Sequence, residues 1–153
     1  ANFAQRGGVI FAEGSAASYL CRKIVLSNGE IYNTVGILPA VANAVRADTD
    51  WGSPLYCEVT SVNDSPISTR GQMARGYRDA RWLVRLEGKI PIAFKVLEVD
   101  ITSGEGSKGQ LVYEDDGLMP IPNVLATTVQ IHWGSNPSLA ERFINYMTGG
   151  AKP

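Results

Sequence analysis

The residues of this sequence best suited to nucleophilic chemistry are one histidine and two cysteines. His132 is the only histidine and lies in TTVQIHW (127–133), whereas Cys21 and Cys57 lie in SYLCRKIVL and PLYCEVTSV. A thiol within hydrogen-bond reach of an imidazole could act as a nucleophile with its base. No cysteine-protease or G-x-S-x-G signature surrounds these residues. The alternation of the run places His132 on the polar face of a strand, so we expect no catalytic role for it.

Acidic and glycine-rich segments offer a second kind of chemistry. Three carboxylates cluster in YEDDG at residues Glu114, Asp115 and Asp116. Such a cluster could hold a hard cation or perform acid–base work, but the spacing of a calcium loop is absent, so we expect a solvated turn. The run TSGEGSKGQ (102–110) lacks the order of a phosphate-binding loop and is expected to join two strands. Since the histidine and the cysteines also lack zinc spacing, we predict no metal site and no cofactor.

The arginines are concentrated in one part of the chain. Five of nine lie within sixteen residues, namely Arg70, Arg75, Arg78, Arg81 and Arg85. Arginine forks suit desolvated interfaces, and the acids of 114–116 provide a complementary partner. We therefore predict an interface between identical copies, formed by these five arginines with Glu114, Asp115 and Asp116. The alternative is nucleic-acid binding through Arg75, Tyr77, Arg78 and Trp82.

The elements that would position these side chains are mainly strands. Eight short runs alternate or are rich in β-branched residues, and Asn28-Gly29 between two of them predicts a hairpin. The runs cover 8–13, 18–27, 31–38, 54–62, 80–87, 92–101, 109–114 and 127–133. Long irregular stretches are expected at about 47–53 and 63–79. The fold class predicted is mainly β, an antiparallel β-sandwich or barrel of about eight short strands.

Two helices are predicted beside the strands. Pro39 followed by alternating Ala and Val favours a short helix near 39–47. At the C-terminus, Ser138 and Glu141 have the spacing of a capping box before an apolar stripe, and Gly149 supplies the stop.

Size and charge limit the class of protein. The 153 residues fit a single β-rich domain over 1–153, and a net charge of −1 gives no global attraction to nucleic acid or membrane. No run is long enough to span a bilayer, and the first residues lack a signal peptide, so we expect a soluble protein made in the cytoplasm. Both cysteines are expected to be buried thiols, although a disulfide stays open.

At the level of architecture, this pattern is similar to the small β-rich virion subunits of bacteriophages. Tail-tube, connector, capsid and decoration subunits share the short strands, flanking helix and long loops. That resemblance implies a non-enzymatic structural subunit that self-assembles, with copies of itself and other particle subunits as partners, and a virion location. Two alternatives stay open: a nucleic-acid-binding OB-like barrel using the cluster from Arg70 to Arg85, and a small hydrolase using His132 with a cysteine or with the 114–116 carboxylates.

Overall fold

The computed structural model describes residues 1–45, 55–78, 81–98 and 112–149. These residues form eleven strands, three α-helices and one 3-10 turn. The helices are α1 (Asn2–Gln5), α2 (Ser15–Tyr19) and α3 (Ser138–Met147), and the 3-10 turn spans Trp133–Ser135. The strands are β1 (Ile10–Glu13), β2 (Lys23–Val25), β3 (Ile31–Asn33), β4 (Ala40–Ala44), β5 (Leu55–Ser61), β6 (Met73–Arg78), β7 (Trp82–Leu86), β8 (Ile92–Glu98), β9 (Val112–Leu118), β10 (Val124–Thr127) and β11 (Val129–Ile131).

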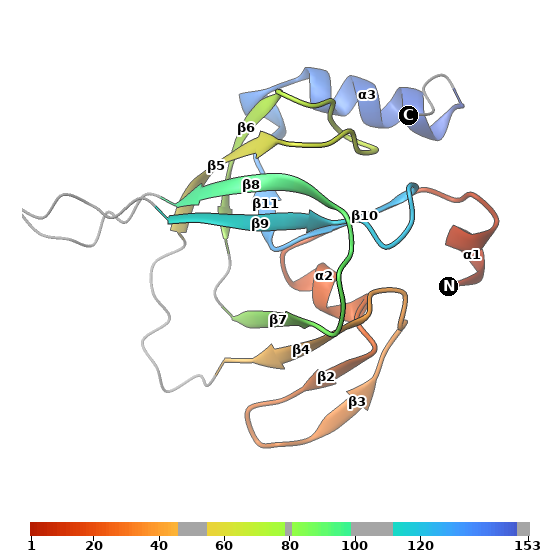
Figure 1. Cartoon of the computed structure of the whole chain (residues 1–153), viewed down its shortest axis with the longest axis vertical. Coiled ribbons are helices and arrows are strands. Elements are labelled where there is room, and N and C mark those ends of the chain that lie inside the picture. The colour runs from red at the N-terminus through yellow and green to blue at the C-terminus, as the bar shows by residue number, and fades with distance from the viewer. Residues whose placement is uncertain (46–54, 79–80, 99–111, 150–153) are drawn as a thin grey trace, which may run out of the picture.

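The larger sheet has seven strands in the order β1-β10-β9-β8-β5-β6-β11. Thr128 alone separates β10, the second strand of this order, from β11, the last strand, so the chain brings the two edges of the sheet together and the sheet curls into a nearly closed barrel (Figure 1). Most neighbours are antiparallel, but β1 and β10 run parallel. Phe94, Val96 and Leu125 lie fully buried at its core, and Phe143 of α3 packs against the same cluster.

The smaller sheet has the order β3-β2-β4-β7 and lies apart from the barrel, with α2 between them (Figure 1). A second core joins the two sheets, because Ala17 of α2, Ala42 of β4 and Val124 of β10 are buried in one cluster. The hairpin predicted at Asn28-Gly29 is confirmed: β2 and β3 pair across it, and Gly29 takes the positive φ of 88° that the turn requires.

The predicted fold class is confirmed as mainly β and barrel-like with a C-terminal helix. Each of the eight predicted runs overlaps a strand, although β9 extends beyond its run to Leu118, and the strands β4, β6 and β10 were not predicted. The short helix expected near 39–47 is wrong, because that segment is the strand β4. Ala40 and Ala42 are fully buried between the sheets, where β4 pairs with β2 and β7. Tertiary pairing therefore overrides the helix propensity of alanine.

Strand β6 lies in the stretch 63–79 that was expected to be irregular. Its inward positions are Ala74 and Gly76, whose small size hides the alternation of the strand. Position 76 requires glycine, because a Cβ there would lie 2.4 Å from the carbonyl oxygen of Gln130 on β11. The irregular stretch expected at about 47–53 and the glycine-rich run 102–110 lie outside the described residues.

Helix α3 begins where it was predicted, but its cap differs. The capping box of Ser138 and Glu141 is wrong, since Ser138 is already the first helical residue. Asn136 takes the capping role, accepting hydrogen bonds at Oδ1 from the amide and the hydroxyl of Ser138 at 3.3 and 2.7 Å. Gly149 follows the helix at a φ of 81°, which confirms the predicted stop. Among the described residues, no helix has the length and apolar character needed to cross a membrane.

Candidate functional site

The most unusual backbone geometry in a polar setting is the turn from β1 into α2. Gly14 joins strand and helix with φ 57° and ψ −131°, a conformation that strains any residue with a Cβ. The turn resembles a nucleophile elbow, a sharp strand-to-helix turn in which the residue at the turn carries the attacking side chain. Here the turn residue is glycine, so the elbow carries no nucleophile.

The side chain of Gln130 fills the space beside the elbow. A Cβ built on Gly14 would lie 2.8 Å from Gln130 Nε2 and 2.9 Å from its Cγ. The hydroxyl of Tyr77, on the neighbouring strand β6, donates a hydrogen bond to Gln130 Oε1 and so fixes the amide in place. Gln130 therefore fills the space that a side chain at position 14 would need.

A carboxylate completes the polar group. Glu13 is the last residue of β1, and its Oε2 accepts a hydrogen bond from the backbone N–H of Ile131 at 3.2 Å. Burial raises the pKa of Glu13 above its ordinary value, more than the backbone hydrogen bond lowers it. Because β1 and β10 are parallel and paired from Ile10–Val124 to Glu13–Thr127, Glu13 and the following Gly14 lie at the carboxyl end of this strand pair. We call Glu13, Gly14, Tyr77 and Gln130 the elbow site.

The stability of a Gly14 variant tests how closely the Gln130 side chain packs against position 14. We expect Gly14→Ala to lower the free energy of unfolding by about 1–3 kcal/mol through backbone strain, with a further loss from the contact with Gln130. Gly29→Ala is the matched control, because Gly29 has a φ of 88° but nothing within 4 Å of its Cβ position. In denaturant unfolding, Gln130→Ala should recover part of the Gly14→Ala loss and none of the Gly29→Ala loss.

The pKa of Glu13 predicts how stability depends on pH. A carboxyl whose pKa is raised by folding stabilises the protein fully below the unfolded value, and that contribution is lost as pH rises through the folded pKa. The wild type should therefore lose stability relative to Glu13→Gln as pH increases above about 4.5. Thermal unfolding of both proteins from pH 4 upward tests this, and a difference that stays constant with pH would contradict the raised pKa.

The predicted nucleophiles do not meet the predicted base. Cys21 and Cys57 form no disulfide and are buried in the two separate cores, while His132 is exposed and its ring packs on Gly134. Burial raises the pKa of Cys21 to about 11, so its thiolate is scarce at neutral pH. The hydrolase pairing of His132 with either cysteine is therefore wrong.

The acidic cluster is paired within the chain. Glu114, Asp115 and Asp116 belong to β9 rather than to a solvated turn. Arg78 contacts Glu114 and, at 3.6 Å, Asp116, and Lys95 pairs with Asp115. Asp116 is buried and accepts hydrogen bonds from the amide and hydroxyl of Thr128. In the described residues no group of three or more histidines, cysteines or acids could hold a metal ion.

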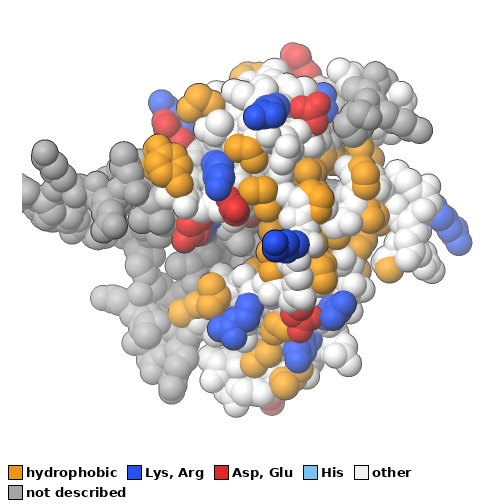
Figure 2. Space-filling view, viewed as in Figure 1, with side chains coloured by type: hydrophobic (Ala, Val, Ile, Leu, Met, Phe, Trp, Pro, Cys, Tyr) orange, Lys and Arg blue, Asp and Glu red, His pale blue; other side chains and the backbone are white. Residues whose placement is uncertain are grey.

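The clustered arginines do not share one surface. Arg75 is exposed beside Glu58 at 3.6 Å, Arg78 points inward to the acids of β9, and Arg85 lies on β7 of the smaller sheet. Arg70 donates its backbone amide to Asp64, and Arg81 begins the approach to β7. On the face shown in Figure 2, basic, acidic and apolar side chains are intermixed. The predicted interface between copies stays a prediction.

The residues of the nucleic-acid alternative are likewise separated. Arg75 and Tyr77 project from the outer face of β6, Arg78 points inward, and Trp82 packs against the second core. Hence Tyr77 and Trp82 do not form a common stacking surface for bases.

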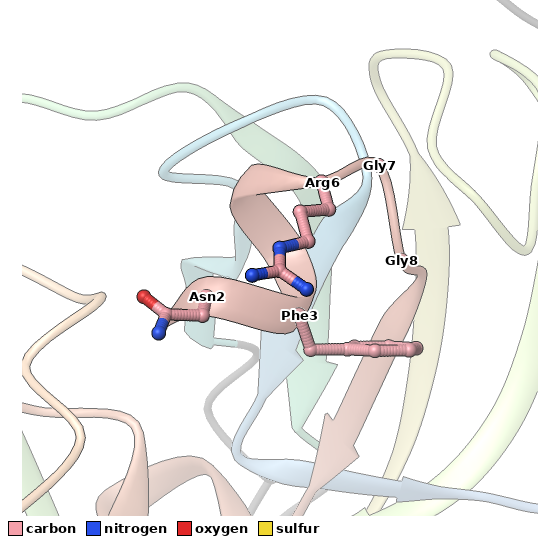
Figure 3. A pocket seen from close by; sticks show the side chains of 5 residues that line it. All are labelled: Asn2, Phe3, Arg6, Gly7 and Gly8. Carbon is pink, nitrogen blue, oxygen red and sulfur yellow. The ribbon is translucent and has the colours of Figure 1, made fainter.

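An open pocket of about 580 Å³ lies at the N-terminal helix, away from the elbow site. Asn2, Phe3, Arg6, Gly7 and Gly8 line it, and Figure 3 shows the Phe3 ring extending from α1 toward Gly8. A Cβ at Gly8 would lie 2.4 Å from that ring. The pocket is built from one short segment, and it contains one charged group, Arg6, so it offers no pair of groups for catalysis.

Comparison with known proteins gives a consistent result. The chain is 31% identical over 138 residues to the cobyrinate a,c-diamide synthase of Thermoplasma acidophilum, covering 90% of this chain and 28% of that protein. It is 29% identical over 144 residues to the enzyme of the same name from Thermoplasma volcanium, and 28% identical over 146 residues to that of Dehalococcoides mccartyi. The chain thus spans less than a third of the length of the curated relatives that it matches. No protein-family model matches it.

These relatives correct the functional predictions. A non-enzymatic bacteriophage subunit located in a virion is wrong, because the relatives that match over most of the chain carry the name of a biosynthetic enzyme. The OB-like nucleic-acid-binding alternative is wrong for the same reason. Strand pattern and clustered charge do not by themselves indicate assembly, because Arg78 pairs with Glu114 and Asp116 of β9 within the chain.

The elbow site was missed by sequence reasoning, although a signal for it exists. The run VIFAEGSAAS (9–18) is an apolar strand, then glycine, then small residues suited to a short helix. The match to the Dehalococcoides mccartyi protein covers 95% of the chain, which leaves about eight residues outside it, so Gly14 and Gln130 both lie within the matched region.

Proposed function

We propose that this chain is a section of an enzyme that converts carboxylates of a cobyrinate-like corrinoid into amides. The reaction follows the name of the relatives, which describes a synthase that makes a diamide of cobyrinate. The observation that carries it to this chain is the elbow site, which lies inside the matched region and places polar groups at the carboxyl ends of a parallel strand pair.

Amide formation at a carboxylate needs an activated acyl group and a nitrogen nucleophile. A nucleoside triphosphate can supply the activation by transferring a phosphoryl group to the carboxylate oxygen. In this proposal, the chain contributes fixed hydrogen-bonding groups near the reacting carbon: the amide of Gln130, held by Tyr77, and the carboxyl of Glu13. Groups that are fixed in advance stabilise developing charge without reorganisation.

The test is a direct assay of the purified enzyme of which this chain is proposed to be a section. Cobyrinate, ATP with Mg²⁺ and an ammonium salt are incubated with it, and the corrinoid is analysed by liquid chromatography and mass spectrometry. We expect a product in which carboxyl groups are replaced by amides, formed only when ATP is present. Gln130→Ala should slow its formation, whereas Gln5→Ala on the remote helix α1 should not. An unchanged corrinoid in every reaction would overturn the proposal.

A further inference from the structure

The elbow of this chain keeps the shape of a nucleophile site and lacks the nucleophile. Enzymes that take nitrogen from a donor amide such as glutamine must break the amide C–N bond, and covalent catalysis by an activated thiol or hydroxyl is the common means. Gly14 provides neither group, and Gln130 stands where such a side chain would need room.

Substitutes for the missing thiol are absent among the described residues. The whole sequence has two cysteines, and both are buried within separate hydrophobic clusters. The raised pKa of Cys21 further lowers the concentration of its thiolate. His132, the only imidazole of the sequence, is exposed and packs on Gly134, whereas both thiols are buried in the cores.

Given the proposed function, on which this inference rests, we propose that the elbow performs no nucleophilic step and that nitrogen enters the reaction as free ammonia. The step balances without a donor amide. The carboxylate oxygen takes the terminal phosphoryl group of ATP, giving an acyl phosphate and ADP. Ammonia then attacks the carbonyl carbon, the new C–N bond forms, the C–O bond to phosphate breaks, and one proton of the ammonia leaves with the phosphate.

The nitrogen source can be identified with the same assay. Protein, cobyrinate and ATP with Mg²⁺ are supplied either with ammonium alone or with glutamine labelled with ¹⁵N in its side-chain amide and freed of ammonium. We expect amide product with ammonium, none with glutamine, and no release of glutamate when the protein is incubated with glutamine alone.

The outcomes distinguish failure of the ammonia inference from failure of the proposed function. Labelled amide from glutamine, or glutamate released by the protein, would overturn the ammonia inference and leave the proposed function standing. Product from ammonium alone supports both. No amide from either source would overturn the proposed function and this inference with it.

Discussion

Replacement of Asp116 by alanine is expected to lower the free energy of unfolding by about 3–5 kcal/mol, because the groups that pair with its buried carboxylate would lose their partner. Asp116 is 3% exposed, and it accepts hydrogen bonds from the amide of Gly117 and from the side chains of Thr127 and Thr128. The guanidinium of Arg78 lies at 3.6 Å. This carboxylate joins β9, β6 and the point where β10 passes into β11, so its loss affects the closure of the barrel.

Asp115 is the matched control, one residue away on the same strand. It is exposed and pairs with Lys95, and exposed ion pairs contribute up to about 1 kcal/mol. Urea unfolding of Asp116→Ala and Asp115→Ala should therefore differ by several-fold in the stability lost. Equal losses for both variants would mean that Asp116 does not hold the barrel closed.

The second large effect is expected for Phe94→Ala, which should lower the free energy of unfolding by about 3–5 kcal/mol. Phe94 is 1% exposed at the centre of the barrel core. Gly117 on β9 lies over its ring, where a Cβ would be 2.7 Å from Phe94 Cδ2, so the ring fills its site closely. Removing it leaves a cavity that the surrounding strands cannot close.

Phe3→Ala provides the comparison for Phe94, since Phe3 is 64% exposed on α1. Phe3→Ala should lower the free energy of unfolding by less than half as much as Phe94→Ala does, as measured by thermal or denaturant unfolding. If both variants unfolded at similar denaturant concentrations, the barrel core would not be centred on Phe94.

Strands β5 and β8, whose inward residues are large, could be predicted from the sequence, whereas β4 and β6, whose inward residues are small, could not. Val59, Phe94 and Val96 give β5 and β8 a visible alternation with buried side chains. In β4 and β6 the buried positions carry alanine or glycine, so the sequence gives no hydrophobic period. Their strand character comes from pairing with distant neighbours, which a local pattern does not contain.

The elbow site illustrates the same limit for function. Gly14 and Gln130 are 116 positions apart and meet because β1 pairs in parallel with β10, next to β11 in the chain. Charge clustering, by contrast, was visible in the sequence, but the sequence does not show which of the clustered side chains pair within the chain. Arg75 and Arg78 are three residues apart, yet one is exposed and the other points into the barrel.

Gln130 fills the space that a nucleophilic side chain at position 14 would need. Introducing a thiol there, as Gly14→Cys, and measuring its alkylation by iodoacetamide with intact-mass detection tests this. Displacing Gln130 and its hydrogen bond to Tyr77 should cost about 1–1.5 kcal/mol, so Gln130→Ala should accelerate alkylation about tenfold. A Gly29→Cys thiol in the exposed hairpin should react at the same rate with or without Gln130→Ala. If Gln130→Ala left the reactivity of Cys at position 14 unchanged, Gln130 would not fill the elbow, and the central claim would fail.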